Sequence, residues 1–364
     1  MLDVQSIYII HGEDAKRMVI ESLEKLELFK ELSPTMRIGI KPNIVLEKHS
    51  SSGATTSVDL IDGVVEYLKM KGFNNITILE SSGIGHNTQL AYKVTGLDKV
   101  ALKHNIELID LKGQPTVTLS YKDFNVQVFK KVQEIDYLIN MPVVKAHCQT
   151  NITCALKNLK GLIPDNEKRR FHRDGLHRPI AYLNKIINTD LIIADGIMGD
   201  LTFEEGGNPV RMDRVLIAKD PVLIDRFVAE SIGYDPKEVA HVDISATLGV
   251  GKSKIDKAKI VELNAPVKKQ ELYKRSYLIE SLAKKIRERE ACSICYGSLI
   301  FALKRLKDNG KIIKNTDYIY IGQGYKDFVG EGVGVGNCTK GFSKFLQGCP
   351  PNANSIVEFL EQNL

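Results

Sequence analysis

Four cysteines near the carboxyl end of this 364-residue chain have the types and spacing of a metal centre. Cys292 and Cys295 form a C-x-x-C pair, and Cys338 and Cys349 follow in the segment GNCTKGFSKFLQGCPP. A C-x-x-C turn brings two thiolates to one metal ion or to one face of a cluster, and adjacent glycines let backbone amides approach the cluster sulfurs. Four thiolates without a histidine fit a [4Fe–4S] cluster or a structural zinc ion. Zinc sites usually combine two tight pairs, and only the first pair here is tight, so the spacing favours the cluster.

Disulfides and buried packing are the other roles open to these cysteines. The amino-terminal MLDVQSIYIIHGEDAKRM lacks the pattern of a signal peptide, and no apolar run reaches the ~18 residues that a membrane span needs. We therefore expect a cytoplasmic protein, in which thiols stay reduced and serve as ligands before they serve as disulfides. The net charge of +5 is mild, which predicts neither a nucleic-acid partner nor a membrane partner and is compatible with anionic ligands.

A second group of polar residues lies between 140 and 178. Apolar runs surround several of its lysines and amides, and an unpaired lysine in such a place would be costly to bury. Lysines that converge beyond a strand end can bind phosphate or carboxylate, so we expect an anionic small-molecule substrate. The candidate substrate-binding residues are Lys41, Asn43, Lys157, Asn158 and Lys160, and the candidate catalytic residues are Lys145, His147, His172 and Asp195.

Several of these residues have a plainer alternative role. Asp195 ends the apolar run TDLIIADGIMG, where an aspartate can act as a base or a metal ligand but can also cap a turn. His172 could supply acid–base chemistry near neutral pH, although it lies in a basic stretch that could be a solvated loop. Cys148 follows His147 directly, so a neighbouring cation could lower the pKa of its thiol and make it reactive.

Short β-branched runs alternate with helical patterns through the first three quarters of the chain. Strands are expected over 6–12, 36–45, 75–83, 106–113, 136–145 and 189–199, and helices over 13–32, 56–72, 88–104 and 150–161. This alternation predicts an α/β fold with a doubly wound, mostly parallel sheet, which binds ligands beyond the carboxyl ends of its strands. An antiparallel hairpin is expected within 116–132.

The pattern changes near 265–290, where a charged helical stretch begins. We therefore expect two domains, an α/β domain over 1–265 and a small α/β iron–sulfur domain over 266–364. The second should contain a helix over 297–309, a strand over 316–324 and a closing helix over 353–363.

Two resemblances to known families rest on these motifs. The segments IKPNIV, INMPVVKAH, ITCALKNLKGLIP, IIADGIMG and AKDPVLIDRFVAESIGYDP together resemble the DUF362 family over roughly residues 35–265. That resemblance implies an association with iron–sulfur clusters and no generally assigned reaction. The carboxyl-terminal cysteines resemble the proximal [4Fe–4S] motif of hydrogenase small subunits. Many DUF362 members end in a compact ferredoxin-like cysteine run, whereas this chain has a dispersed set, which suggests a single cluster.

Three functions remain open at this point. The first is an iron–sulfur enzyme, an oxidoreductase or lyase, that acts on an anionic small molecule in a Lys- and His-lined cleft next to the cluster and receives electrons from a donor protein. The second is a ferredoxin-like electron-transfer protein. The third is a zinc-stabilised binding protein without catalysis.

Overall fold

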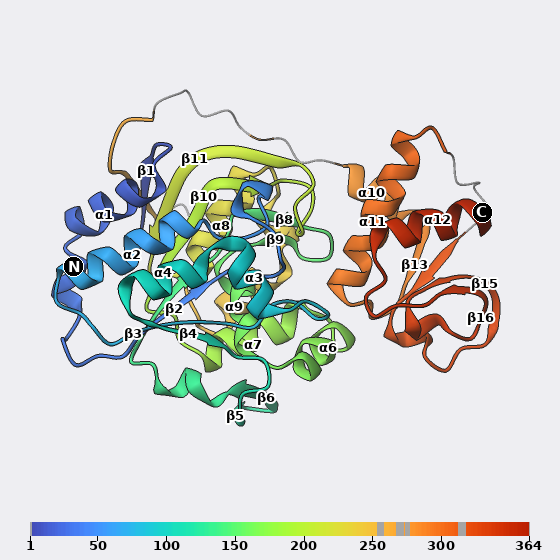
Figure 1. The fold of residues 1–364 in the computed structure, drawn as a ribbon, viewed down its shortest axis with the longest axis horizontal. Coiled ribbons are helices and arrows are strands. Elements are labelled where there is room, and N and C mark those ends of the chain that lie inside the picture. Colours follow the sequence, from blue (N-terminus) through green and yellow to red (C-terminus); the bar gives the residue numbers. More distant parts are fainter. Residues whose placement is uncertain (1, 253–257, 267–272, 274–276, 312–317, 364) are drawn as a thin grey trace. The chain divides into compact units, whose positions relative to one another are not determined.

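The computed structural model describes residues 2–252, 258–266, 273, 277–311 and 318–363. By their internal packing they divide into two compact units (Figure 1). The first unit comprises 1–167 and 177–275, and the second comprises 168–176 and 276–364.

A sheet of eight strands forms the centre of the first unit, in the order β12-β1-β11-β10-β7-β2-β3-β4. Its strands are β1 (Ser6–His11), β2 (Ile38–Pro42), β3 (Ile76–Glu80), β4 (Glu107–Asp110), β7 (Tyr137–Met141), β10 (Leu191–Asp200), β11 (Pro209–Ala218) and β12 (Lys259–Glu262). Only β11 runs antiparallel to its neighbours, β1 and β10, and every other adjacent pair is parallel. The expected doubly wound, mostly parallel sheet is confirmed.

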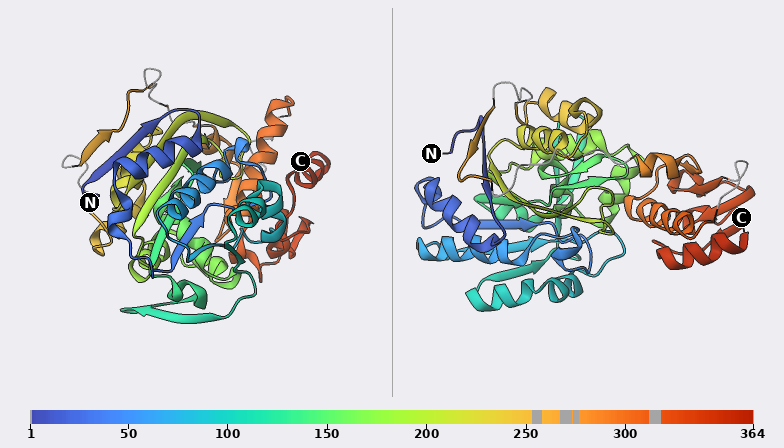
Figure 2. Two further views of the ribbon diagram at one scale, coloured as in Figure 1. Left: turned by 60° about the vertical axis from the view of Figure 1, so that its left-hand side comes forward. Right: turned by 90° about the horizontal axis from the view of Figure 1, so that it is seen from above.

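Helices cover both faces of this sheet (Figure 2). One face carries α1 (Ala15–Lys25), α2 (Val58–Met70), α3 (Thr88–Thr95) and α4 (Leu97–His104), and the other carries α8 (Pro221–Ser231) and α9 (Ala240–Thr247). The helices α5 (Ala155–Asn158), α6 (Asp165–Arg173) and α7 (His177–Ile186) follow β7. Every residue of β2, β3 and β7 is buried, as expected of parallel strands between two helical layers.

Two short hairpins complete the first unit. The strands β5 (Thr116–Tyr121) and β6 (Phe124–Phe129) pair antiparallel, which confirms the hairpin expected within 116–132. The strands β8 (Lys145–His147) and β9 (Asn151–Thr153) form the second hairpin. The sequence pattern instead indicated one continuous helix over 150–161. That expectation was wrong, because β9 occupies its first part and α5 forms only one turn.

The second unit is a smaller α/β structure. Its four strands, β13 (Ile286–Glu288), β14 (Ile319–Ile321), β15 (Gly330–Val335) and β16 (Phe342–Leu346), are all parallel and lie in sequence order. Its helices are α10 (Leu278–Ala283), α11 (Ser293–Asp308) and α12 (Ala353–Asn363). The long charged helix expected near 265–290 was wrong in the described part, since α10 ends at Ala283 and β13 begins at Ile286. Positions 267–272 and 274–276 of that expected helix lie outside the described residues. The same holds for the first two residues of the strand expected over 316–324.

None of the helices in the described part of the chain has the length and apolar character of a membrane span.

Candidate functional site

The expected anion-binding residues lie at the ends of two neighbouring strands, β2 and β7. From these strands the chain continues in opposite directions along the sheet. After β2 the chain passes through α2 to β3, and after β7 it passes through α5 and α7 to β10, on the other side of the pair. Such a switch point is where doubly wound sheets bind ligands. Lys41 and Asn43 come from the end of β2, and Asn140 and Lys145 come from the end of β7 and the strand that follows.

A closed network of lysine and amide side chains fills this switch point. The Lys41 ammonium is 2.8 Å from a Glu80 carboxylate oxygen and also donates to the Pro42 carbonyl at 2.6 Å. Asn158 Oδ1 accepts from Asn43 Nδ2 at 2.8 Å, and Asn158 Nδ2 donates to Asn140 Oδ1 at 2.7 Å. All of these side chains are buried. Lys41, Asn43 and Asn158 therefore bond mainly to one another, and this network holds the ends of β2, β3 and β7 together.

Gly161 is required by the same network. A Cβ atom at this position would lie 1.9 Å from Glu80 Oε1 and 2.7 Å from Lys41 Nζ, so only glycine fits against the ion pair. Its neighbour Lys160, also a candidate ligand, lies on the 3₁₀ turn Leu159–Leu162 and is partly exposed.

Lys145 connects this network to a second set of polar residues, the one around Glu204. Its ammonium donates to Asn43 Oδ1 at 2.8 Å and to the Ala54 carbonyl at 2.7 Å, and the side chain is fully buried. Both acceptors are neutral. Burial lowers the pKa of Lys145 to about 8, because the charged form is poorly solvated there.

His147 and Lys157 hold the carboxylate of Glu204, and we call these two side chains the carboxylate clamp. His147 Nε2 lies 2.7 Å from Glu204 Oε2, and the Lys157 ammonium donates to Glu204 Oε1. Lys157 also donates to Thr153 Oγ1 at 3.3 Å. Burial opposes ionisation of Glu204, but the neighbouring His147 and Lys157 hold its pKa well below the usual range. The clamp therefore holds a carboxylate of the protein itself.

The backbone sets the tautomer of His147. Its Nδ1 accepts the N–H groups of Gln149 and Thr150, both at 3.0 Å, so the ring proton resides on Nε2, the atom that faces Glu204. Burial lowers the pKa of His147 to about 4. At neutral pH the ring is thus uncharged, and its N–H group lies close to an anion.

Glu80, Glu204 and Glu205 belong to this site, and the sequence analysis missed all three. Glu204 and Glu205 follow the end of β10 in the segment LTFEEGG, so the strand-end argument that selected Asp195 could have selected them too. Burial and the neighbouring Glu204 raise the pKa of Glu205 to about 8. The two adjacent carboxyl groups therefore differ in charge at neutral pH.

Asp195 and Cys148 have more restricted roles than their types allow. Asp195 is buried, and its two oxygens accept the N–H groups of Ser57 at 2.7 Å and Ile197 at 2.9 Å, so it fixes the start of α2. Burial raises its pKa to about 6. Burial also raises the pKa of the Cys148 thiol, which is the opposite of the activation that a neighbouring cation would cause.

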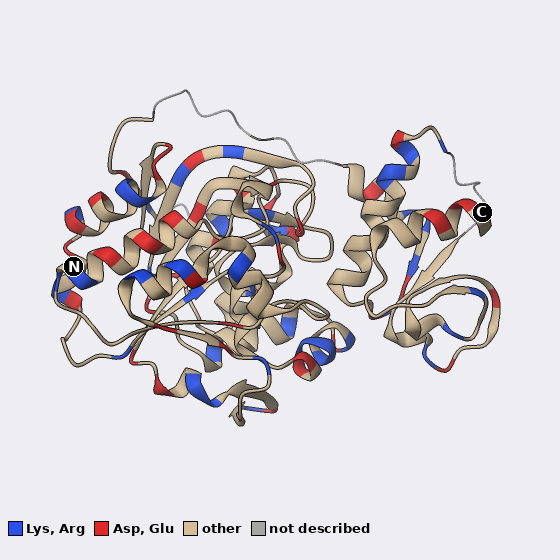
Figure 3. Ribbon diagram, viewed as in Figure 1, with Lys and Arg blue, Asp and Glu red and all other residues tan. Residues whose placement is uncertain are grey.

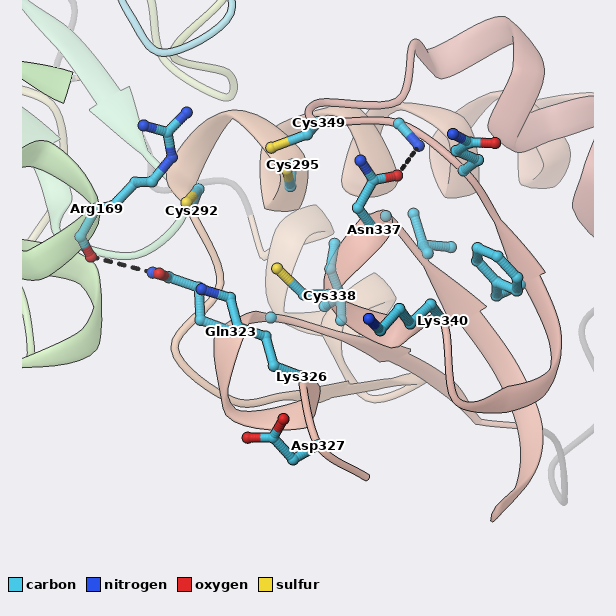
Figure 4. Close-up of a pocket in the computed structure, with 17 residues that line it drawn as sticks. Arg169, Cys292, Cys295, Gln323, Lys326, Asp327, Asn337, Cys338, Lys340 and Cys349 are labelled. Carbon is cyan, nitrogen blue, oxygen red and sulfur yellow. Dashed lines mark hydrogen bonds between the residues drawn. The ribbon is translucent and has the colours of Figure 1, made fainter. Parts of the chain in front are cut away.

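The second unit contains a cavity of about 640 Å³ into which all four carboxyl-terminal cysteines face (Figure 4). Cys292 caps α11 and Cys295 lies in its first turn, whereas Cys338 lies on the 3₁₀ turn Asn337–Thr339 and Cys349 on the loop after β16. The other polar side chains of its lining are Arg169, Gln323, Lys326, Asp327, Asn337, Lys340 and Gln347. All six cysteines of the chain are described and none is in a disulfide.

Backbone contacts hold the two cysteine loops against each other. The Asn337 N–H donates to the Gly348 carbonyl at 2.9 Å, and the Gly348 N–H donates to Asn337 Oδ1 at 2.7 Å. Gly348 has φ +153°, and a Cβ atom there would lie 2.5 Å from Pro351. His172 contacts the residue after Cys292, since the Ser293 hydroxyl is 3.4 Å from its Nε2. Of the four candidate catalytic residues, His172 thus belongs to the cysteine unit and the other three to the first unit.

The sulfurs are more widely spaced than a single zinc ion requires. A tetrahedral ion with Zn–S bonds of ~2.3 Å would bring its thiolates to about 3.8 Å from one another. Within the described residues, the group of three or more metal-type ligand atoms that lie within 4.8 Å of one another is Asp62, Glu66 and His104, so no three of the cysteines meet that limit. A cubane separates its ligands because each thiolate binds a different iron.

That other group, on α2 and α4, is an ion-pair network. Lys16 lies 2.9 Å from Asp62 and 2.5 Å from Glu66, and Lys103 lies 2.8 Å from Asp62. Figure 3 shows acidic and basic residues interspersed along these outer helices. The carboxylates are therefore already neutralised by lysines.

The fold and the switch-point site define a doubly wound α/β protein, and comparison with known proteins gives its family. A family model described as "Domain of unknown function (DUF362)" matches residues 38–230, just over half of the chain. The protein belongs to the DUF362 family, as its motifs indicated. The matched region contains both the lysine–amide network and the carboxylate clamp.

Two further similarities are more distant. The thylakoid-associated protein sll1697 of Synechocystis sp. is 22% identical over 250 residues, which cover 64% of this chain and 74% of that protein. The lactate racemase apoprotein of Thermoanaerobacterium thermosaccharolyticum aligns with a TM-score of 0.39 at 14% identity, over 63% of this chain. The chain spans 57% of the length of that structure's chain.

Proposed function

We propose that this protein is an iron–sulfur enzyme whose second unit holds one [4Fe–4S] cluster and whose first unit binds an anionic small molecule. The observation that carries the proposal is the convergence of Cys292, Cys295, Cys338 and Cys349 on one cavity. Two of them lie at the start of α11, where the positive end of a helix dipole favours thiolates. When bound, such a cluster supplies one-electron transfer.

The surroundings of the cysteines fit a negatively charged group. Arg169, Lys326 and Lys340 line the same cavity and can balance the charge of four thiolates and their iron. Burial raises the pKa of the Cys338 thiol, and the positive charges of Lys326 and Arg169 oppose this rise. Zinc is the alternative metal, and the wide spacing of the sulfurs disfavours it.

The first unit supplies what an enzyme needs and an electron carrier does not. In our proposal the carboxylate clamp and Lys145 orient the negative group of the substrate, and the Nε2–H of His147 donates a hydrogen bond to it. We infer redox chemistry, with a protein electron donor, as the class of reaction. The ferredoxin-like alternative is favoured by one feature, the exposure of Cys349.

Metal analysis of anaerobically purified protein tests this proposal. We expect about four iron ions and about four sulfide ions per chain. We also expect an absorbance band at about 400 nm, characteristic of a [4Fe–4S] centre. Cys338→Ser should remove most of the iron, whereas Cys154→Ser, in the first unit, should retain it. Stoichiometric zinc without sulfide would exclude the cluster and support the zinc alternative.

A second pair of variants separates enzyme from carrier. His147→Ala and Lys157→Gln should leave the cluster spectrum and the rate of its reduction by dithionite unchanged. They should weaken binding of small anions, because each removes one half of the clamp. Unchanged anion binding in both variants would favour the carrier.

A further inference from the structure

Glu204, the residue that the carboxylate clamp holds, comes from an irregular segment and not from the sheet. Glu204 lies between β10 and β11, within residues 201–208. Asp200, at the end of β10, holds the base of this segment by accepting the N–H groups of Thr202 and Phe203 at 2.8 and 2.6 Å. Farther along, Lys48 donates to the Glu205 carbonyl at 2.7 Å.

Contacts that do not involve Glu204 hold the two side chains of the clamp in place. Backbone amides orient the His147 ring, and Lys157 also contacts Thr153. The turn α5, which carries Lys157, is fixed by Asp225, which accepts the N–H groups of Ala155 at 2.7 Å and Leu156 at 3.2 Å. The binding position is therefore pre-organised and belongs to elements other than the one that occupies it.

Glu204 satisfies only part of the hydrogen-bonding capacity of the clamp. His147 is 2% exposed, and its Nε2 makes no hydrogen bond of acceptable direction although Glu204 Oε2 is 2.7 Å away. A buried ring N–H without a well-directed acceptor loses the energy of that bond. A ligand that is not tied to the backbone of 201–208 can approach Nε2 along its N–H direction.

The charges nearby suit one carboxylate. Two lysines, Lys145 and Lys157, and two carboxylates, Glu204 and Asp200, lie around the clamp, and the partly exposed Lys160 adds a further positive charge near His147. Asp200 accepts the N–H groups of three residues in 201–208, including that of Asn208 at 2.8 Å. Its carboxylate is therefore bound to that segment and not to the clamp. Exchange of Glu204 for an external monocarboxylate leaves this balance unchanged, whereas a phosphate dianion alters it.

We propose that Glu204 occupies the binding position of the carboxylate group of a small-molecule ligand, and that the segment 201–208 leaves the clamp when this ligand binds. The inference rests on the anion site of the proposed function and not on the iron–sulfur cluster. It identifies the ligand class as a carboxylic acid anion and makes Glu204 its internal competitor.

Titration of Glu204→Gln with acetate tests the competition. The full-length protein is titrated calorimetrically with sodium acetate and, separately, with inorganic phosphate, at an ionic strength kept constant with sodium chloride. We expect the variant to bind acetate at least about tenfold more tightly than the wild type, and phosphate with a smaller gain. Glu47→Gln is the matched control, because Glu47 also pairs with a histidine, His86 at 2.5 Å, and should give no gain.

Hydrogen exchange tests the movement in the wild-type protein and does not depend on any variant folding. Saturating acetate should increase amide exchange in 201–208 and leave β8 and α5 unchanged. Equal acetate affinity in wild type and Glu204→Gln, or acetate binding without faster exchange in 201–208, would overturn the proposal and make Glu204 a structural ion-pair partner. A gain for phosphate alone would overturn the assignment to carboxylates. The same titrations on Cys338→Ser protein separate this result from any failure of the cluster assignment.

Discussion

Lys41 and Glu80 are both buried, and each side chain is the other's counter-charge. Glu80 Oε2 accepts the Lys41 ammonium at 2.8 Å and the Ile44 N–H at 3.0 Å, while Oε1 accepts the Ser81 N–H. One carboxylate therefore joins the end of β3 to the end of β2. Burial lowers the pKa of Lys41 and the attraction of Glu80 opposes this, so Glu80 supports the charge of the Lys41 ammonium.

Replacing Glu80 with glutamine should strongly destabilise the first unit. The change leaves the Lys41 ammonium buried without a counter-charge, which costs about 3 to 5 kcal/mol in comparable pairs. Urea unfolding followed by circular dichroism measures the loss. Asp136→Asn, which removes the partner of the exposed Arg37, should have little effect. A Glu80→Gln variant as stable as the wild type would show that the pair contributes nothing to folding.

A pH-dependent loss of stability should come from Asp225. Burial raises the pKa of this carboxyl to about 7, well above the ~4 of the unfolded chain, so the folded state binds the proton more tightly. Stability that this group contributes is complete below pH ~4 and falls as the pH rises toward 7, by a few kcal/mol at most. Asp225→Asn should flatten this decline, measured by urea unfolding between pH 4 and 8. A decline of equal slope in the variant would assign it to other groups.

At the scale of elements, the two cysteine loops depend on hydrogen bonds between Asn337 and Gly348. Cys338 and Cys349 are far enough apart in sequence that neither fixes the other, and the reciprocal bonds of Asn337 and Gly348 align the loops. The first cysteine pair needs no such support because α11 orders it. The second pair is therefore the part of the site most sensitive to changes outside the cysteines.

Removing the Asn337 side chain should make the cluster labile. Asn337→Ala deletes the acceptor of the Gly348 N–H and should increase the rate at which a chelator bleaches the visible absorbance, by about fivefold or more if the bond contributes about 1 kcal/mol. Asn354→Ala, which removes the partner of Arg305 at 2.6 Å on α11, is the matched control. Equal bleaching rates in both variants would show that Asn337 does not support the site.

The elements were predictable because their signals are local. Continuous apolar runs such as Tyr137–Met141 indicated strands buried on both faces, and such burial is independent of partners farther along the chain. Glu80 and Glu204 follow the same strand-end pattern as Asp195, but their partners, Lys41 and His147, are distant in the sequence, so no local pattern encodes the pairing. The lysines and asparagines around them were found because they interrupt apolar runs, but the sequence did not indicate that they bond mainly to one another.

At the scale of the whole molecule, each unit contains its own site. The described residues that line the cysteine cavity belong to the second unit, and those of the carboxylate clamp belong to the first. Each site also has its own structural support, namely α11 and the paired loops in one case and the switch point of the sheet in the other. Binding at one site should therefore be measurable while the other is empty.

Loss of the metal centre should leave anion affinity unchanged. In a Glu204→Gln background, Cys292→Ser combined with Cys338→Ser should remove the iron, and the acetate dissociation constant should stay within about twofold, the limit expected for independent sites. Iron analysis and calorimetric titration of the same preparation measure both quantities. Glu204→Gln protein with all cysteines intact is the control. A shift of tenfold or more would mean that the occupied cysteine cavity changes the clamp, and the substrate would then sense the state of the cluster before any electron is transferred.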